Sequence, residues 1–279
     1  MSAEGGVVGA RTRAIHGALL LMALIVLVPF LWVMSAGFRT QISLISGDFY
    51  FTPTLASFQD VMFSKASDFF LNFRNSMVIG LASTLICLFV ATLCAWSLHR
   101  MRWPSWIVHS FLAWVLVFNM VPPVTLAGAW FTMYRTIGLD NTFAGMIIAH
   151  VTLNLPMAIW LMAVFVREVP EELVEAARID GASTPLILAR IVTPLVAPGL
   201  AATGVLVFVF SWNEFAVSLN LSMKQTATVP VAIAKYAQDF DIQYTQMAAS
   251  AALSIIPAVI LLLIGQRFIV KGLTAGAVK

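Results

Sequence analysis

The stretch VPEELVEAARIDGASTPLILARIVTP, residues 169–194, is a charged segment in a chain of which only 10% of the residues are charged. Its residue order predicts a short helix. Pro170 suits a first helical position, where its missing N–H is no loss, and Glu171 then lies in the first turn, where an acid is favourable. Asp180 and Gly181 predict the end of this helix, because glycine readily accepts a left-handed backbone.

A second short helix is predicted in the same stretch. Ser183 or Thr184 can cap its start, and Pro185 would lie just inside it. Pro194 is expected to close it. An amphipathic helix pair between apolar segments indicates a docking surface for a soluble partner.

Composition places the rest of the chain in a membrane. Of its 279 residues, 60% are hydrophobic, above the 45–50% of soluble domains. Backbone polar groups must be satisfied within lipid, so the long apolar runs are expected to be helices. We therefore predict an all-α polytopic membrane protein. The net charge of +3 is too small to indicate a nucleic-acid partner.

Six apolar runs are long enough to cross a bilayer, which takes about 20 helical residues. They cover residues 15–38, 75–98, 106–131, 142–166, 198–221 and 247–268. The first run is too long for a secretory signal and is expected to be a retained helix. Prolines inside the runs predict kinks, at Pro29, Pro122, Pro123, Pro156 and Pro257.

Six spans place both termini on one side, and the distribution of Lys and Arg decides which side this is. The side of the termini holds the larger group: Arg11, Arg13, Arg100, Arg102, Arg167, Arg178, Arg190, Arg267, Lys271 and Lys279. The other side holds Arg39, Lys65, Arg74, Arg135, Lys224 and Lys235. Both termini and the charged helix pair are therefore expected in the cytoplasm.

Motifs for chemistry are missing from the sequence. There is no G-x-x-x-x-G-K-[ST] loop, so the chain is not expected to hydrolyse ATP. No H-E-x-x-H occurs and the four histidines are scattered, so no metal site is expected. No G-x-S-x-G occurs either, and we predict a protein that is not an enzyme.

The charged stretch resembles the EAA loop of permease subunits of ATP-binding-cassette (ABC) importers. That pattern is E-A-A, three residues, G, nine residues, I, one residue and L-P. It matches here at Glu175, Ala176, Ala177, Gly181, Ile191 and Pro194, with Thr193 in place of the leucine. Residues 211–215, SWNEF, and the tail GLTAGAVK, residues 272–279, are similar to the carbohydrate branch, the inner-membrane permease of maltose-type importers.

The resemblance implies a fold and an organisation. The fold would be that of a type I ABC importer permease, with six transmembrane helices and a cytoplasmic coupling-helix loop. The expected parts are a cytoplasmic segment, residues 1–13, a first helix with an external loop, 14–70, a permease domain, 71–268, with the EAA loop at 168–195, and a cytoplasmic tail, 269–279. The location would be the bacterial inner membrane.

The resemblance also implies partners. A second permease subunit would complete a heterodimeric pore, two cytoplasmic ATPases would use ATP and Mg, and an extracytoplasmic sugar-binding protein would deliver the substrate. The chain itself would bind no cofactor and would contact lipid, but no nucleic acid. The expected ATPase-coupling residues are Glu171, Glu172, Glu175, Ala176, Ala177, Asp180, Gly181 and Pro194. The tail residues Gly272, Leu273, Thr274, Gly276 and Lys279 would also reach the ATPases.

Polar residues inside the apolar runs are candidates for the substrate pathway. Asn119, His150 and Asn154 are expected near mid-bilayer, where polar groups face the bundle interior or a cavity. Hydrogen bonding between helices is the alternative for these three residues. Asn213 and Glu214 are expected near the outer end of their span, either at the outer mouth or as an interfacial helix end anchored by Trp212.

Other functions compatible with the sequence are an importer for a solute that is not a sugar and a stand-alone secondary transporter. A secondary transporter would need acidic groups in the membrane for ion coupling, and only Glu214 lies near it. The resemblance to the carbohydrate branch favours a sugar, a polyol or a glycoside.

Overall fold

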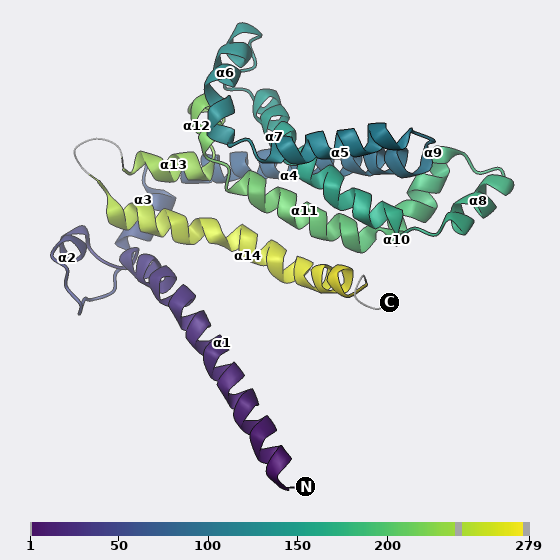
Figure 1. Ribbon diagram of the computed structural model, residues 1–279. Coiled ribbons are helices and arrows are strands. Elements are labelled where there is room, and N and C mark those ends of the chain that lie inside the picture. Colours follow the sequence, from purple (N-terminus) through teal and green to yellow (C-terminus); the bar gives the residue numbers. More distant parts are fainter. Residues whose placement is uncertain (1, 238–241, 276–279) are drawn as a thin grey trace. The chain divides into compact units, whose positions relative to one another are not determined.

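The computed structural model describes residues 2–237 and 242–275, and the side chains of residues 12, 15–237 and 242–266. Every regular element in this part of the chain is a helix (Figure 1). The chain divides into two compact units, which are described in turn. The first comprises Met1–Ser67 and Ile233–Leu253, and the second comprises Asp68–Ala232 and Ser254–Lys279.

The first unit contains α1 (Ser2–Ala36), α2 (Gln41–Ile45), α3 (Ala56–Phe63) and the first turns of α14 (Tyr244–Ala275). The apolar part of α1 has no buried residues within the chain, as expected of a helix that faces lipid. Arg39 closes the loop that follows α1. Its guanidinium lies 4.1 Å from the ring centroid of Phe51, and Nη1 donates to the Asp48 carbonyl at 2.7 Å.

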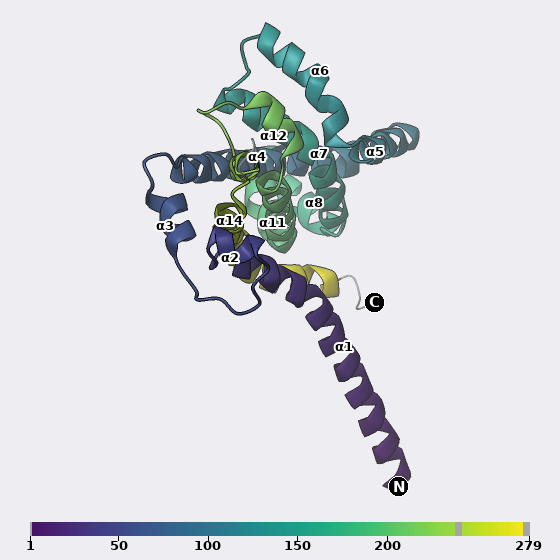
Figure 2. The same ribbon diagram turned by 90° about the vertical axis from the view of Figure 1, so that its left-hand side faces the viewer.

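The core of the second unit is formed by α4 (Phe69–Arg100), α7 (Phe143–Arg167) and α11 (Ala197–Trp212), which pack together, with α5 (Ser105–Asn119) against α7 (Figure 2). Small residues allow close approach of membrane helices. Ala91 and Ala158 are fully buried between them. A Cβ at Gly199 would lie 2.3 Å from Cγ of Phe165, so this contact requires glycine.

Within the described residues, four helical segments are each long and apolar enough to cross a membrane: Ile15–Ala36, Phe69–Arg100, Phe143–Arg167 and Tyr244–Gln266. Two bent helix pairs bring the number to six when each pair is counted as one span. The predicted polytopic helical architecture is therefore confirmed.

The third predicted span, residues 106–131, is not one continuous helix. It is broken into α5 and α6 (Pro123–Thr136), which meet at an angle of 93°. A proline disfavours helical backbone at the preceding residue, and Pro122 and Pro123 place that effect at consecutive positions. Proline also suits the start of a helix, and Pro123 begins α6.

The fifth predicted span, residues 198–221, is also wrong as a continuous helix. It ends at Trp212, and α12 (Ala216–Leu221) follows as a separate helix. The side chain of Glu214 accepts hydrogen bonds from the backbone N–H groups of Val217 and Ser218, at 2.7 and 2.8 Å. These are N–H groups that have no partner within a new helix, so Glu214 stabilises the break.

The charged stretch forms a short helix, α8 (Glu171–Ile179), with Pro170 one residue before it. The predicted end of the helix is confirmed. Asp180 follows α8, and Gly181 has φ +80°, the left-handed backbone that glycine adopts without strain.

The second helix of this stretch comprises α9 (Thr184–Ile187), a π-helical segment η1 (Leu188–Val192) and α10 (Thr193–Leu195). The prediction that Pro194 closes the helix is wrong, because Pro194 lies within α10. Thr193 N–H donates to the Leu188 carbonyl, which widens the turn. A widened turn accommodates Pro194, because proline brings no N–H for the usual bond.

The loop after α12 is fastened to the first turns of α4. Nδ2 of Asn75 donates to the carbonyls of Gln225 and Ala227, at 2.9 and 3.1 Å. The neighbouring Ser76 hydroxyl accepts the N–H of Val229, the first residue of α13 (Val229–Lys235), at 2.8 Å. The second half of this loop and the start of α13 are thereby held in place.

Candidate functional site

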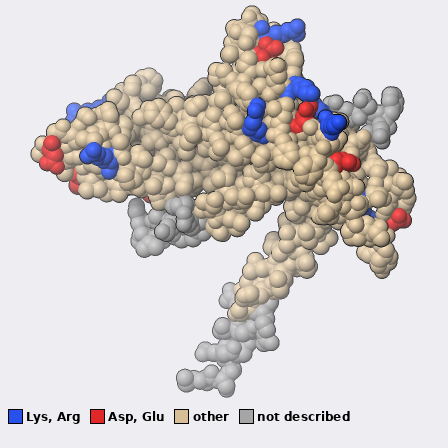
Figure 3. Space-filling model, turned by 180° about the vertical axis from the view of Figure 1, so that it is seen from behind, with Lys and Arg blue, Asp and Glu red and all other residues tan. Residues whose placement is uncertain are grey.

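The outer surface of α8 is mostly acidic, with Arg178 as an exposed basic residue in its last turn. Glu171, Glu172, Glu175 and Asp180 are all exposed, as are Ala176, Gly181 and Pro194. In Figure 3, Asp, Glu, Lys and Arg side chains mark the left-hand end of the molecule, where α8 lies by comparison with Figure 1. Ala177 differs from the other predicted coupling residues, because it is buried against the core of the chain.

Arg100 fixes the start of α8. Its side chain is buried at the end of α4 and donates to the carbonyl of Val169. Its Nη1 also lies 3.6 Å from a carboxylate oxygen of Glu171. The sequence marked Arg100 only as a basic residue at the end of a span, and nothing in its spacing showed that it would reach α8.

Two apolar side chains on α8 complete its outer surface. Ile179 is 87% exposed and Leu173 is 46% exposed. An exposed isoleucine beside Asp180 gives the surface an apolar contact in addition to its carboxylates. The helical spacing of Val174 and Ala177, which are buried, could have shown that Ile179 points outward.

Of the five polar residues predicted for the substrate pathway, Asn119, Asn154 and Glu214 line one cavity. A cavity of about 300 Å³ lies among α5, α6, α7 and α11. It is lined by Phe118, Asn119, Val121, Pro123, Leu153, Asn154, Met157, Phe210 and Glu214. Glu214 was expected nearer the outer end of its span than the two asparagines, but the break after Trp212 brings all three to one cavity.

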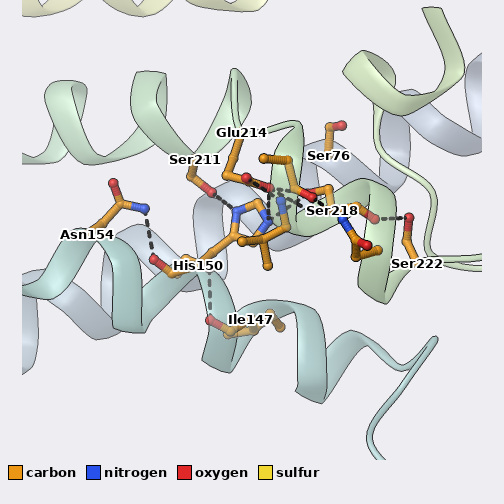
Figure 4. A network of polar contacts seen from close by, with 12 residues as sticks. Ser76, Ile147, His150, Asn154, Ser211, Glu214, Ser218 and Ser222 are labelled. Carbon is orange, nitrogen blue, oxygen red and sulfur yellow. Dashed lines mark hydrogen bonds and ion pairs between the residues drawn. The ribbon is translucent and has the colours of Figure 1, made fainter. Parts of the chain in front are cut away.

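Glu214 is held firmly at this cavity (Figure 4). Its Oε1 accepts the N–H of Val217, and its Oε2 accepts the N–H and the hydroxyl of Ser218, at 2.8 and 2.7 Å. Acidic side chains are favourable at a helix start, where the first backbone N–H groups have no partner within the helix. The carboxylate therefore has one orientation.

His150 lies behind this carboxylate and does not line the cavity. It is fully buried, with Nδ1 2.6 Å from the Ser211 hydroxyl and Nε2 3.1 Å from the Ser218 hydroxyl (Figure 4). Its Nε2 is also 3.8 Å from Oε2 of Glu214. His150 thus joins α7 to α11 and α12, which is the interhelical hydrogen bonding given as an alternative.

Asn213 and Trp212 also lie away from the cavity lining. Asn213 is exposed and donates to the carbonyl of Val209 in the preceding helix, α11. Trp212 is buried between the rings of Phe208 and Phe73 and donates to the Ser254 carbonyl at 3.0 Å. Trp212 is therefore a core residue rather than an exposed anchor.

The predicted tail contacts fall at the end of the described chain. Gly272, Leu273 and Thr274 belong to the last turns of α14. Gly276 and Lys279 lie outside the described residues.

Broken apolar helices that line a cavity, in a unit that also carries the acidic helix α8, are the features expected of a polytopic membrane permease. The chain belongs to the family described as the binding-protein-dependent transport system inner membrane component, whose model matches residues 87–275. It is therefore a multi-pass inner-membrane component of an ABC transporter, and the resemblance seen in the EAA loop is confirmed.

Relatives match over nearly the whole chain. The trehalose transport system permease protein SugB of Mycobacterium tuberculosis is 34% identical, over 97% of this chain and 99% of its own. The trehalose/maltose transport system permease protein MalG of Thermococcus litoralis is 33% identical, over 96% and 97%. A solved bacterial ABC transporter involved in alginate import has the same fold, with a TM-score of 0.73 and 23% identity over 96% of this chain and 98% of its own.

Proposed function

We propose that this chain is the membrane-spanning permease subunit of an ATP-driven, binding-protein-dependent importer that moves a sugar, or a related polyol or glycoside, into the cytoplasm. The observation that carries the proposal is the near full-length similarity to permeases named for trehalose and maltose transport. The chain is a transport subunit, and its work is to open and close a path rather than to make or break bonds.

The proposed importer needs partners. A second permease subunit would complete a heterodimeric pore, and two cytoplasmic ATPases would bind ATP and Mg, for which this chain has no phosphate-binding loop. An extracytoplasmic sugar-binding protein would deliver the substrate. A solved alginate transporter of the same fold, with a TM-score of 0.65, is in complex with a pentasaccharide-bound periplasmic protein.

The coupling surface would be the outer side of α8. In this proposal α8 and both chain termini lie in the cytoplasm, where the ATPases can reach them. Basic groups of an ATPase would pair with Glu172, Glu175 and Asp180, and an apolar pocket would receive Ile179. Arg100 holds α8 against α4, so closure of the ATPases would move α8 and the membrane helices as one body.

The tail from Gly272 to Lys279 is proposed as a second contact with the ATPases. Its deletion is expected to change ATPase activity, sugar uptake or both. Unchanged values of both activities in the truncated importer would exclude this role.

Reconstitution tests the function as a whole. The chain, its partner permease, the ATPases and the binding protein would be placed in proteoliposomes, and uptake of radiolabelled trehalose and maltose would be measured. Uptake of either sugar that needs both ATP and the binding protein is expected. Uptake driven by an ion gradient without ATP, or ATP-driven uptake of an amino acid but of neither sugar, would overturn the proposal.

A further inference from the structure

We propose that the cavity lined by Asn119, Asn154 and Glu214 is a sugar subsite within this subunit, through which the substrate makes direct hydrogen bonds to the chain. This inference rests on the function proposed above. It adds that the sugar is recognised here, rather than being held by the binding protein and the partner permease alone.

The position of the cavity supports this role. Val121 and Pro123 line it at the break between α5 and α6, and Glu214 lines it at the break between α11 and α12. Irregular backbone at membrane depth is tolerated where it is buried in protein or lines a water-filled cavity. The break between α5 and α6 and the break between α11 and α12 thus meet at this one cavity. The helices are interrupted where a polar solute could pass.

Glu214 has acceptor capacity left for a ligand. An ionised carboxylate has about four lone-pair sites. One hydrogen bond reaches Oε1 and two reach Oε2, all from Val217 and Ser218. One site on Oε1 therefore stays open for a hydroxyl group of a ligand.

The asparagines offer both donors and acceptors. Nδ2 of Asn154 donates to the His150 carbonyl at 2.8 Å, and Nδ2 of Asn119 is 3.5 Å from the Val115 carbonyl. Each Nδ2 has a second hydrogen, and neither Oδ1 accepts a hydrogen bond from the described residues. A hydroxyl group both donates and accepts hydrogen bonds. It can therefore bind an amide side chain that has one N–H and its carbonyl oxygen unpaired.

The remaining lining is apolar. Phe118, Leu153, Met157 and Phe210 face the same cavity. A sugar ring presents hydroxyl groups at its rim and C–H groups on its faces, and these suit the amides and the apolar side chains respectively. A volume of about 300 Å³ lies at the lower end for ligand pockets, which fits one sugar ring better than a long oligosaccharide.

The charge of Glu214 narrows the class of ligand. A fixed carboxylate in a partly desolvated cavity repels an anionic group and attracts a hydroxyl donor. The subsite is therefore suited to a neutral polyhydroxylated sugar. His150 and Ser218 keep the carboxylate in place from behind, so His150 is a positioning residue and does not itself contact the sugar.

The test uses Asn154→Ala in the reconstituted importer with trehalose-loaded or maltose-loaded binding protein, whichever the unmodified importer transports. In the proposed importer the loaded binding protein would stimulate ATP hydrolysis without needing the cavity, so we expect this stimulation to stay within about twofold. Sugar uptake at saturating binding protein should fall about tenfold, as expected when hydrogen bonds worth about 1.4 kcal/mol are lost in transit. Asn119→Ala should act in the same direction.

Asn220→Ala is the matched control. Asn220 is exposed on α12 and, like the two cavity asparagines, donates to the carbonyl four residues before it, but it does not line the cavity. Its uptake should equal that of the unmodified importer. Asn154→Gln, which keeps the amide, should recover part of the lost uptake.

The outcomes separate the two proposals. If the unmodified importer takes up neither sugar, the proposed function fails for these substrates. If it takes up a sugar and the two cavity variants leave uptake unchanged, or lower uptake and ATPase activity equally, the subsite is overturned and the function stands. Fewer sugar molecules per ATP in the cavity variants alone supports the subsite.

Discussion

Nδ1 of His150 lies 2.6 Å from the hydroxyl oxygen of Ser211, so that one hydrogen bond between two buried side chains joins α7 to α11. The same imidazole reaches Ser218 in α12 on its other side. One residue thus holds three helices at the point where the membrane-crossing backbone is interrupted.

Replacing His150 by alanine is expected to destabilise the second unit. The Ser211 hydroxyl would lose its partner, which costs about 1–3 kcal/mol, and an empty space would remain beside Glu214. Thermal unfolding of the purified importer should show a Tm lower by about 2 °C or more. His109→Ala is the control, since His109 is exposed and bonds only within its own helix, and an equal drop in both variants would contradict the role of His150.

Replacing Arg100 by alanine is expected to loosen α8. The ion pair contributes little because Glu171 is exposed, so the main loss is the charged hydrogen bond to the Val169 carbonyl, worth about 1.5–3 kcal/mol. Stimulation of ATPase activity by the loaded binding protein should fall about fivefold or more. Arg102→Ala, with its exposed arginine two residues on, should leave stimulation unchanged, and normal stimulation in Arg100→Ala would rule out this link.

Gly181 offers a test of backbone geometry alone. Its φ of +80° costs an alanine about 1–2 kcal/mol, whereas asparagine tolerates the left-handed region better. A Cβ at this position meets no atom of the chain, so no clash confuses the comparison. Sugar uptake per ATP should fall in Gly181→Ala and be largely kept in Gly181→Asn; equal loss in both variants would point to a need for small size instead.

Gly199→Ala is expected to impair packing of α11 on α7. The added Cβ would lie 2.3 Å from Cγ of Phe165, and overpacking of this kind costs about 1–3 kcal/mol. Gly128→Ala is the matched control, because a Cβ at Gly128 would meet no other atom within 4 Å. The yield of assembled importer and its Tm should drop for the first variant only, and unaltered values for Gly199→Ala would refute the close contact.

Local signals in the sequence predicted much of the architecture. The apolar runs, the acidic first turn of α8 and the stop at Gly181 depend on neighbouring residues, and all are present in the structure. Pro122 and Pro123 predicted a kink, but the angle of 93° depends on how α6 packs against α12. Local sequence does not contain that packing.

The arrangement of the candidate site depends more on long-range contacts than the helical architecture does. His150 and Ser218 are 68 residues apart, and no spacing rule relates them. The break at Glu214 lay within a nearly continuous apolar run, so periodicity favoured one helix there. Asn119 and Asn154 were predicted because polar side chains are rare at membrane depth. His150 met the same criterion, but in the structure it joins helices to one another and does not line the cavity.

The contact of Arg100 with Val169 would let α4 transmit movement of α8 in the proposed importer. This helix has 32 residues and is about 48 Å long, so a tilt of about 10° around one end moves the other by about 8 Å. Arg100 joins one end to α8, and Asn75 near the other end holds the carbonyls of Gln225 and Ala227. In the proposed importer, a movement of α8 would therefore be passed along α4 to the loop that Asn75 holds.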